Sequence, residues 1–476
     1  MILDSRDENV DLNRSAQIAI VGAGPAGLIL ANELADVAPV LVIESGGFEV
    51  DADLQALQVG ECVGIDYPLT ETRTRQFGGS SALWAGYCAI FDPHDFAQRE
   101  WVPGSGWPFG VEAIEPYYEK TAKLLNLGDF NFDPHDIAAR AGIVLPFDNE
   151  VVVPSVWRFG TPTLRISEHL REQFETSQNI TTLTHANVVD IRLDAEQSMV
   201  TELVTRTLGG REGRISADIF VLACGGIETP RILLNADSQV SLGLGNANDM
   251  VGRNFMEHPH LPITPLILKE TGLFKNWVER GCYDDSRQFL LCMGLSAQAQ
   301  EEAKILNARA HIYRTPRMSD DETPKVGVFL EQAPNPNSRV TLSDRTDSLG
   351  MRRICLDWQI TELDWKTYEK TALSLGREFE SINAGRMRVS TQPTNRDNRL
   401  LLYSNHHLGT TRMSKNRIDG VVDQNSRMHD YDNLYIAGGS IFPSVSWANP
   451  TFTLVALILR LADHLRSEIN PSSHRA

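Results

Sequence analysis

Residues 17–44 read QIAIVGAGPAGLILANELADVAPVLVIE. A short apolar run ends in the glycine motif at 22–27, a helix-like stretch follows over 28–34, and a second apolar run at 39–43 ends in Glu44. The order strand, glycine turn, helix, strand is that of the first unit of a Rossmann-like dinucleotide-binding fold. The sequence therefore predicts an α/β fold that binds a dinucleotide.

Each small residue of this motif has its own physical task. Gly22 permits the tight turn, Gly24 lets the backbone approach a pyrophosphate, and Gly27 lets the helix pack closely on the strand. Pro25 and Ala26 open the helix, whose free N–H groups face the anion. These five residues are the first predicted cofactor contacts.

Glu44 closes the unit, 22 residues after Gly22. A carboxylate at the end of the second strand can accept hydrogen bonds from the ribose hydroxyls of an adenosine, and it would repel a 2′-phosphate. The motif by itself does not choose between NAD and FAD.

Other segments far along the chain repeat the pattern of a strand that runs into glycines. One follows the apolar run 219–223, another follows 433–437, and a Gly-Ser turn with a tryptophan lies near residue 80, where a plain loop is the alternative. Elements so distant imply one cofactor domain that is assembled from separate segments. The residues that these segments would bring to the cofactor are Gly79, Ser80, Ser81, Trp84, Cys224, Gly225, Gly439 and Ser440.

Composition and charge exclude several classes of protein. The 476 residues hold 44 Lys and Arg against 62 Asp and Glu, a net charge of −18 with no basic run, which argues against nucleic acid or an anionic membrane as partner. Six scattered cysteines indicate neither a disulfide framework nor a metal site. The start of the chain lacks the features of a signal peptide, and no apolar stretch reaches the roughly 20 residues of a membrane span. A cytoplasmic protein without a direct membrane anchor is expected.

Several motifs together resemble the glucose-methanol-choline (GMC) oxidoreductase family. They occur in family order over nearly the whole chain, and the branch they resemble is the bacterial sugar type, similar to pyranose oxidases and to flavin-dependent gluconate and glucoside dehydrogenases. The motifs are the glycine turn at 22–27, Gly78-Gly79-Ser80-Ser81 with Trp84, Gly106-Trp107-Pro108 with Pro116-Tyr117-Tyr118, Val251-Gly252-Arg253-Asn254 with His258-Pro259, Glu331-Gln332 with Asn335 to Val340, and His406 to Met413 through Gly439-Ser440 to Asn449-Pro450-Thr451.

The resemblance implies the architecture and the cofactor. We expect a Rossmann-like FAD-binding domain beside a β-sheet-based substrate domain, α/β in the first part and α+β overall, as in GMC enzymes and p-hydroxybenzoate hydroxylase. The FAD domain is predicted at 15–100, 180–262 and 400–476, and the substrate-binding cap at 101–179 and 263–399. Family members that bind FAD covalently have a histidine at the position of Leu83, so noncovalent FAD is expected here.

The implied reaction is oxidation of an alcohol to a carbonyl, with hydride transfer to flavin N5 and removal of the hydroxyl proton. An imidazole suits the proton near neutral pH. His406 matches the catalytic histidine of the family, and Asn449 matches the second catalytic position, where it would orient the substrate oxygen and also contact the cofactor. His407 is the rival base, expected to point the other way as a packing or surface residue. His258 is expected to fix a loop near the flavin.

Four further residues complete the predicted site. Pro450 and Thr451 open the last helix, which is placed to stabilise negative charge near N1 and C2=O of reduced flavin, with an ordinary capped helix as the alternative. Val188 matches the position that sandwiches adenine, or is a simple strand residue. Gln332 is a plausible substrate amide, because each buried hydroxyl of a polyol needs a partner.

The sequence therefore predicts an FAD-dependent enzyme that oxidises a sugar, a glycoside or a related polyol such as an aminoglycoside. The electron acceptor would be oxygen or a dye, quinone or cytochrome-type acceptor. Two alternatives stay open: a flavin subunit of a membrane-tethered dehydrogenase complex, and a non-redox lyase on the same fold. The oligomeric state is not predicted.

Overall fold

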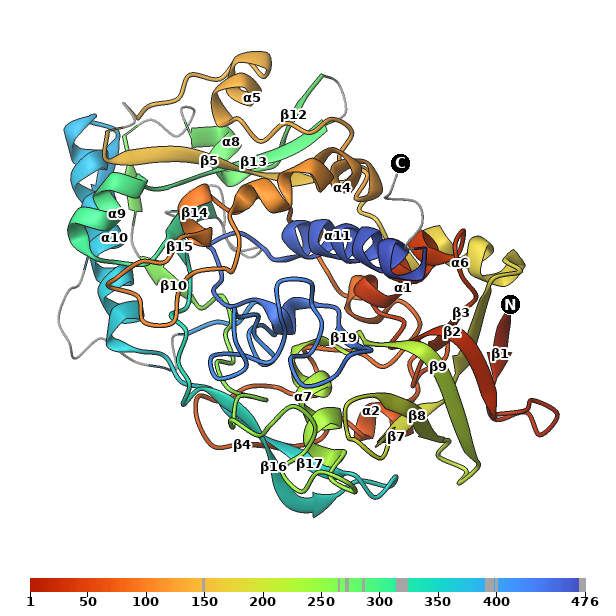
Figure 1. Cartoon of the computed structure of the whole chain (residues 1–476). Coiled ribbons are helices and arrows are strands. Elements are labelled where there is room, and N and C mark those ends of the chain that lie inside the picture. Colours follow the sequence, from red (N-terminus) through yellow and green to blue (C-terminus); the bar gives the residue numbers. More distant parts are fainter. Residues whose placement is uncertain are drawn as a thin grey trace.

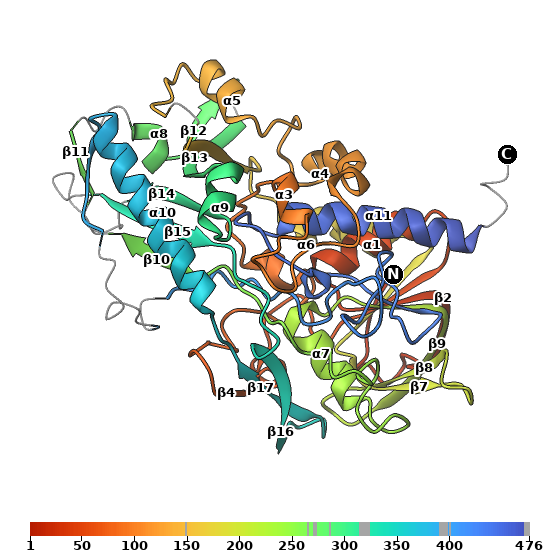
Figure 2. The same cartoon turned by 60° about the vertical axis from the view of Figure 1, so that its left-hand side comes forward.

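Two large β-sheets and the helices packed on them build the described part of the molecule. The computed structural model of the chain contains one large sheet near the N-terminus, a second large sheet further along the chain, and two small sheets. Figures 1 and 2 show the two large sheets in separate halves of the molecule, with α11 extending along the first. The residues that the structure describes are 1–147, 150–263, 266–269, 274–284, 287–313, 324–389, 398 and 401–470.

The first sheet has eight strands in the order β1-β6-β3-β2-β9-β8-β7, with β19 paired to β9. The pairs that involve β1, β2, β3, β6 and β19 are parallel, including those of β2 and β19 with β9. The pairs β7–β8 and β8–β9 are antiparallel. The strands are β1 (Ile2–Asp4), β2 (Arg14–Val21), β3 (Val40–Ile43), β6 (Ile180–Thr184), β7 (Asn187–Leu193), β8 (Val200–Arg206), β9 (Glu212–Leu222) and β19 (Leu434–Ile436).

The register of this sheet aligns the ends of its parallel strands. Val21 at the end of β2 lies opposite Ile43 and Leu222, Ile43 lies opposite Leu183, and Leu222 lies opposite Ile436. The chain therefore leaves the sheet from five neighbouring strands at nearly the same level. In doubly wound sheets this carboxyl edge is where ligands bind.

Helices cover the first sheet because its parallel strands are apolar on both faces. The helix α1 (Pro25–Leu34) packs against α11 (Thr451–Ile469) and α6 (Ile166–Thr176), and α4 (Tyr118–Leu124) also packs on α11. In Figures 1 and 2 α7 (Gly225–Asn235) lies on the other side of the strands from α1 and α11.

The second sheet is antiparallel and has its own apolar core. Its order is β10-β15-β14-β13-β12, with β5 paired to β13, and α10 (Glu362–Ser381) packs against β5, β13, β14 and β15. Its strands are β5 (Val152–Phe159), β10 (His260–Ile263), β12 (Gly281–Tyr283), β13 (Arg287–Leu295), β14 (Ala308–Tyr313) and β15 (Lys325–Leu330).

A three-stranded sheet lies beside the first large sheet. In it β17 (Arg352–Asp357) pairs with both β16 (Arg339–Thr346) and β4 (Glu61–Cys62), and β16 packs against α7. The remaining elements are the strand pair β11 (Leu266–Leu268) and β18 (Gly385–Met387) and the helices α2 (Ala52–Ala56), α3 (Pro93–Phe96), α5 (Pro134–Arg140), α8 (Lys275–Val278) and α9 (Ala297–Ala303).

The predicted fold class is confirmed, with a Rossmann-like parallel sheet and a second β-sheet region. Seven strands of the first sheet lie in the predicted segments 15–100, 180–262 and 400–476, and β1 precedes them. The hairpin of β16 and β17, which falls inside 263–399, packs against α7, which falls inside 180–262. The domain boundaries stay a prediction. None of the described helices combines the length and apolar character that a membrane span requires.

The contact between the glycine turn and α1 supplies a test of the fold. A Cβ on Gly27 would overlap the carbonyl oxygen of Gly22, whereas a Cβ on Gly24 would meet no protein atom within 4 Å. Gly27→Ala should therefore lower the unfolding free energy of the FAD-free protein by about 1–3 kcal/mol through overpacking. Gly24→Ala is the matched control and should leave it unchanged, as measured by circular dichroism during thermal unfolding. Equal unfolding temperatures of the two variants would contradict the close packing.

Candidate functional site

The glycine turn joins β2 to α1 at the carboxyl edge of the first sheet. Gly22 has φ +103°, and a Cβ there would lie 2.7 Å from the carbonyl oxygen of Ala223. Only glycine suits both the positive φ and this close approach. The helix begins at Pro25, where the missing N–H of proline leaves no donor unsatisfied. The turn therefore brings the N-terminus of α1 to the strand ends.

Glu44 lies at the same edge, directly after β3. Its Oε2 accepts a hydrogen bond from the N–H of Ala23 at 2.7 Å, and its Oε1 accepts one from the N–H of Gly46 at 2.8 Å. Burial raises the pKa of Glu44, and both hydrogen bonds oppose that shift. Each carboxylate oxygen accepts more than one hydrogen bond, so Glu44 keeps acceptor capacity for ribose hydroxyls.

A cavity with an empty volume of ≈ 1160 Å³ runs along this edge, and eleven of the sequence-predicted residues line it. They come from segments as far apart as residues 22 and 439. The lining residues predicted from the sequence are Gly22, Gly24, Pro25, Ala26, Glu44, Gly79, Ser80, Val188, Cys224, Gly225 and Gly439. Those outside the lining are Gly27, Ser81, Trp84, His406, Ser440, Asn449, Pro450, Thr451 and Gln332.

The lining fits the FAD that the resemblance implies. The side-chain atoms Oε1 of Gln58, Oγ1 of Thr74 and Nε of Arg75 are buried at this cavity and have no hydrogen-bond partner among the described residues. A Cβ on Gly24 or on Gly225 would meet no protein atom within 4 Å, so the backbone there is open to a ligand. Room beside the turn and unsatisfied polar groups are what a bound dinucleotide would use.

Several predicted residues lie outside the cavity lining and pack or form hydrogen bonds next to it. Gly27 packs against the glycine turn, Ser81 donates from Oγ to the carbonyl of Gly78 at 2.6 Å, and Trp84 donates from Nε1 to the carbonyl of Leu164 at 2.8 Å. Ser440 is fully buried beside Gly439. These contacts give the wall of the cavity its shape.

The last helix begins where the sequence predicts. Pro450 caps α11, Thr451 is its first residue, and Leu454 reaches the cavity lining. The first N–H groups of a helix have no partner within the helix and carry its positive dipole end. The structure therefore brings this end of α11 near the cavity, while Pro450 and Thr451 themselves lie outside the lining.

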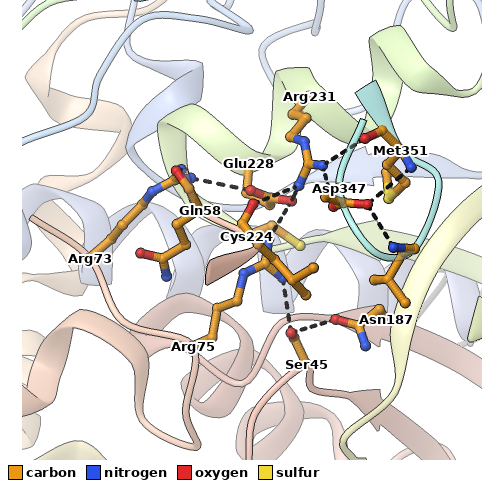
Figure 3. A network of polar contacts seen from close by, with 12 residues as sticks. Ser45, Gln58, Arg73, Arg75, Asn187, Cys224, Glu228, Arg231, Asp347 and Met351 are labelled. Atoms are coloured by element: carbon orange, nitrogen blue, oxygen red, sulfur yellow. Dashed lines mark hydrogen bonds and ion pairs between the residues drawn. The ribbon is translucent and has the colours of Figure 1, made fainter. Parts of the chain in front are cut away.

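A network of charged residues at the cavity escaped the sequence analysis (Figure 3). Glu228 on α7 accepts from Arg73 at 3.2 Å, from Arg75 at 2.7 Å and from Arg231 at 2.9 Å. Burial opposes ionisation of Glu228, but the three guanidinium groups outweigh it and hold the pKa of this carboxyl well below its usual value. With Asp347 included, the network contains three guanidinium groups and two carboxylates, and guanidinium groups are suited to bind the phosphates of a dinucleotide.

The network has two branches. Arg75 donates to Ser45 Oγ at 2.9 Å, and Ser45 donates to Asn187 Oδ1 at 2.6 Å. The other branch runs from Arg231, which pairs with Asp347 at 2.6 Å. Arg73 and Arg75 precede the predicted Gly-Ser turn, and Arg231 follows the predicted glycines at 225 and 226. Their proximity to these motifs is the signal in the sequence that could have identified them as cavity residues.

Asp347 lies in the turn between β16 and β17. Its Oδ1 accepts from the N–H groups of Leu349 at 2.9 Å and Met351 at 3.1 Å, while Oδ2 pairs with Arg231. Leu349 and Met351 both line the cavity. One carboxylate therefore shapes the turn and fastens it to α7 at the cavity wall.

His406 and Asn449 belong to a second group of residues, joined through His258. The Nδ1 atoms of His258 and His406 are 2.9 Å apart, and Nε2 of His258 lies 2.6 Å from the carbonyl oxygen of Ser446. Ser446 lies three residues before Asn449, whose Oδ1 accepts from Trp157 Nε1 at 2.9 Å. The structure thus links the segments that carry both predicted catalytic residues.

The side chain of Glu257 accepts hydrogen bonds from the backbone of the segments that carry His258 and His406. Its Oε1 accepts from the N–H of His406 at 2.7 Å and from the hydroxyl of Tyr67 at 2.9 Å, and its Oε2 accepts from the N–H groups of His258 at 2.7 Å and Ser404 at 3.0 Å. Burial raises the pKa of Glu257 to about 7, against the effect of these donors. Glu257 therefore ties the two histidine segments together.

The two adjacent histidines face different surroundings. His406 lies against His258, whereas Nε2 of His407 lies 2.9 Å from the hydroxyl of Tyr67, and His407 lines the cofactor cavity. The alternation expected for an extended segment is present, but His407 is a cavity residue and not a surface one. Burial, with neighbouring histidines, lowers the pKa of His406 well below its usual value. His406 is therefore neutral at pH 7 and able to accept a proton.

Gln332 has a different place from the predicted substrate amide. It is fully buried, its Oε1 accepts from the N–H of Glu257 at 2.8 Å and from Trp358 Nε1 at 3.1 Å, and its Nε2 donates to the carbonyl of Gln359 at 3.0 Å. Both ends of the amide are used by the protein. The side chain supports Glu257, and the sequence pattern could not distinguish this task from substrate binding.

Comparisons with known proteins agree with this arrangement. Residues 334–457 match the sequence model of the family described as GMC oxidoreductase. Paromamine 6'-oxidase of Streptomyces fradiae is 22% identical over 98% of this chain and 93% of its own length. The fructose dehydrogenase large subunit of Gluconobacter japonicus is 28% identical over 54% of this chain, and the match spans about half, 48%, of that relative.

A solved structure shares the fold. Pyridoxine 4-oxidase from Mesorbium loti superposes with a TM-score of 0.60 at 19% identity, covering 94% of this chain and 98% of that one. At this level of identity the likeness concerns the fold. The overall fold is therefore one that a solved oxidase chain of similar length adopts.

The ion pair between Asp347 and Arg231 supplies a test of the cavity. Asp347→Asn should weaken the closure of the β16–β17 turn, because it removes one charge of a buried pair, and FAD should dissociate about tenfold faster or more. The readout is the fluorescence of released flavin during dilution. Asp344→Asn, an exposed carboxyl on the same hairpin, is the matched control. Equal release from both variants and the parent protein would refute the closure.

Proposed function

We propose that the chain is a GMC oxidoreductase, an FAD-dependent enzyme that oxidises an alcohol group of a sugar, glycoside or related polyol to a carbonyl. The relatives named for fructose and paromamine support a polyhydroxylated substrate. The observation that carries the proposal is the link from His406 through His258 to Ser446, near Asn449.

The residues of the cavity lining would hold FAD. The turn at Gly22 and Gly24 with the start of α1 would receive the pyrophosphate, Glu44 the adenosine ribose, and Val188 the adenine. When bound, FAD supplies the acceptor for the hydride that leaves the carbinol carbon. Because Leu83 stands where covalent relatives have a histidine, retention would be noncovalent and would rest on these contacts and on the charged network.

His406 would take the hydroxyl proton of the substrate. Its pKa lies well below the usual value because of burial, so it is neutral over the physiological pH range. As the O–H bond of the alcohol breaks, the proton moves to the imidazole and the carbonyl forms when the carbinol carbon loses its hydride. A positioned general base of this kind contributes roughly 10²- to 10⁴-fold to the rate.

Asn449 would orient the substrate oxygen. Its Oδ1 is engaged by Trp157, and the described part of the chain provides no hydrogen-bond partner for its Nδ2. The free end of the amide is therefore the donor end, which suits the oxygen of an alcohol. An amide does not titrate, so Asn449 would not compete with His406 for the proton.

The experiment that tests the function is anaerobic reduction of the purified yellow protein across sugars, glycosides, aminoglycosides and simple alcohols. Bleaching of the flavin by a polyhydroxylated compound is expected, since the hydride must reach the flavin. An unchanged spectrum during turnover of a substrate would instead favour the lyase alternative. Bleaching by simple alcohols alone would contradict the proposed substrate class.

The electron acceptor would be oxygen or a dye, quinone or cytochrome-type acceptor. One relative is named as a large subunit, which favours a test for a partner subunit. Reoxidation of the reduced protein by oxygen within seconds supports an oxidase. Slow reoxidation, together with a redox protein that copurifies, supports a dehydrogenase subunit.

The role of His406 supplies a test by substitution. His406→Ala should keep its FAD and lose roughly 10²- to 10⁴-fold in the rate of flavin reduction, because the hydroxyl proton has no acceptor. Stopped-flow absorbance under anaerobic conditions measures this rate. His169→Ala, at an exposed position of α6, is the control and should reduce as the parent protein does. A His406→Ala variant as fast as this control would remove His406 from the mechanism.

A further inference from the structure

The contact between His258 and His406 decides which nitrogen of His406 is free. Nδ1 of His258 and Nδ1 of His406 lie 2.9 Å apart. At this distance one of the two nitrogens carries a hydrogen and the other accepts it. If neither carried it, two lone pairs would face each other. The hydrogen positions follow from the partner on the far side of His258.

That partner is a carbonyl oxygen, which can only accept. Nε2 of His258 lies 2.6 Å from the carbonyl oxygen of Ser446 and must therefore carry a hydrogen. Burial lowers the pKa of His258 to about 4, so the ring is neutral and has a single N–H. Its Nδ1 is then an acceptor, and the shared hydrogen belongs to Nδ1 of His406.

We propose that His258 is a positioning residue that holds His406 in the tautomer with hydrogen on Nδ1, so that Nε2 of His406 carries the free lone pair. This inference rests on the proposed function and names the atom that takes the proton. Bond by bond, the O–H of the alcohol breaks, an N–H forms at Nε2 of His406, and His258 keeps its own hydrogen on Nε2. The imidazolium that results retains its Nδ1–H contact with the neutral ring of His258.

The backbone makes this contact rigid. The carboxylate of Glu257 accepts from the N–H of His258 at 2.7 Å and from the N–H of His406 at 2.7 Å. The two rings also meet edge to face, with centroids 4.9 Å apart. A fixed spacing matters, because a base that can turn over or change tautomer presents its lone pair for only part of the time.

Among the described residues, the other groups around His406 do not determine its tautomer. The charged and titratable groups around His406 are Glu257, which contacts its backbone N–H, and the rings of His260 and His407, which lower its pKa along with His258. His260 is occupied by Ser404, 2.6 Å from its Nε2, and His407 by Tyr67. Within the described residues, only His258 contacts a ring nitrogen of His406.

The test compares two substitutions in the holoenzyme. His258→Ala removes the acceptor for Nδ1 of His406, whereas His258→Asn keeps an acceptor oxygen close to that position. Flavin reduction should slow at least tenfold in His258→Ala with unchanged substrate affinity, and His258→Asn should recover most of the rate. Equal rates in the two variants, whether both fast or both slow, would overturn the proposal, and FAD content and unfolding temperature show whether each variant is folded.

A second measurement needs no variant at position 258. In holoenzyme labelled with ¹⁵N-histidine, the signals of His406, assigned by their loss in His406→Gln, should show a protonated Nδ1 and an unprotonated Nε2 at neutral pH. A protonated Nε2 would overturn the proposal. This readout does not depend on turnover, so failure of the proposed function would appear separately, as absence of flavin reduction by any polyhydroxylated compound.

Discussion

The buried carboxyl group of Glu257 is the constraint on which the arrangement of the two histidine segments depends. A carboxylate removed from water is stable only when donors surround it, and four donors from three separate chain segments converge here. Two of those donors are the backbone N–H groups of His258 and His406. These hydrogen bonds therefore hold the backbone segments of the two histidines at a fixed spacing, on which the proposed tautomer of His406 depends.

The cofactor cavity has a different electrostatic arrangement. Three arginines surround two carboxylates along its wall. The ion pairs hold the guanidinium groups in place at the cavity wall. Asp347 joins this network to the β16–β17 turn, so a strand pair outside the large sheet takes part in closing the cavity.

The sequence predicted many of the residues that line the cavity, because their signals are local. The glycine motif, its flanking apolar runs and Glu44 lie within 28 consecutive residues, and backbone geometry alone dictates where they go. The arginines at 73, 75 and 231 carry no such signal, since an arginine in a loop or helix is ordinarily a surface residue. Gln332 shows the opposite case. The sequence predicted a substrate contact, whereas in the structure its amide is hydrogen-bonded to Glu257, Trp358 and Gln359.

By itself the sequence determined the α/β class, the glycine turn after the second strand of the chain and several of the segments that line the cavity. Only the tertiary structure decided which residues share a wall and which nitrogen faces which oxygen. The reason is that hydrogen-bond partners such as His258 and Ser446, 188 residues apart, are set by the packing of whole elements. Spacing along the chain gives the type of a side chain, whereas its protonation and role depend on neighbours that folding brings together.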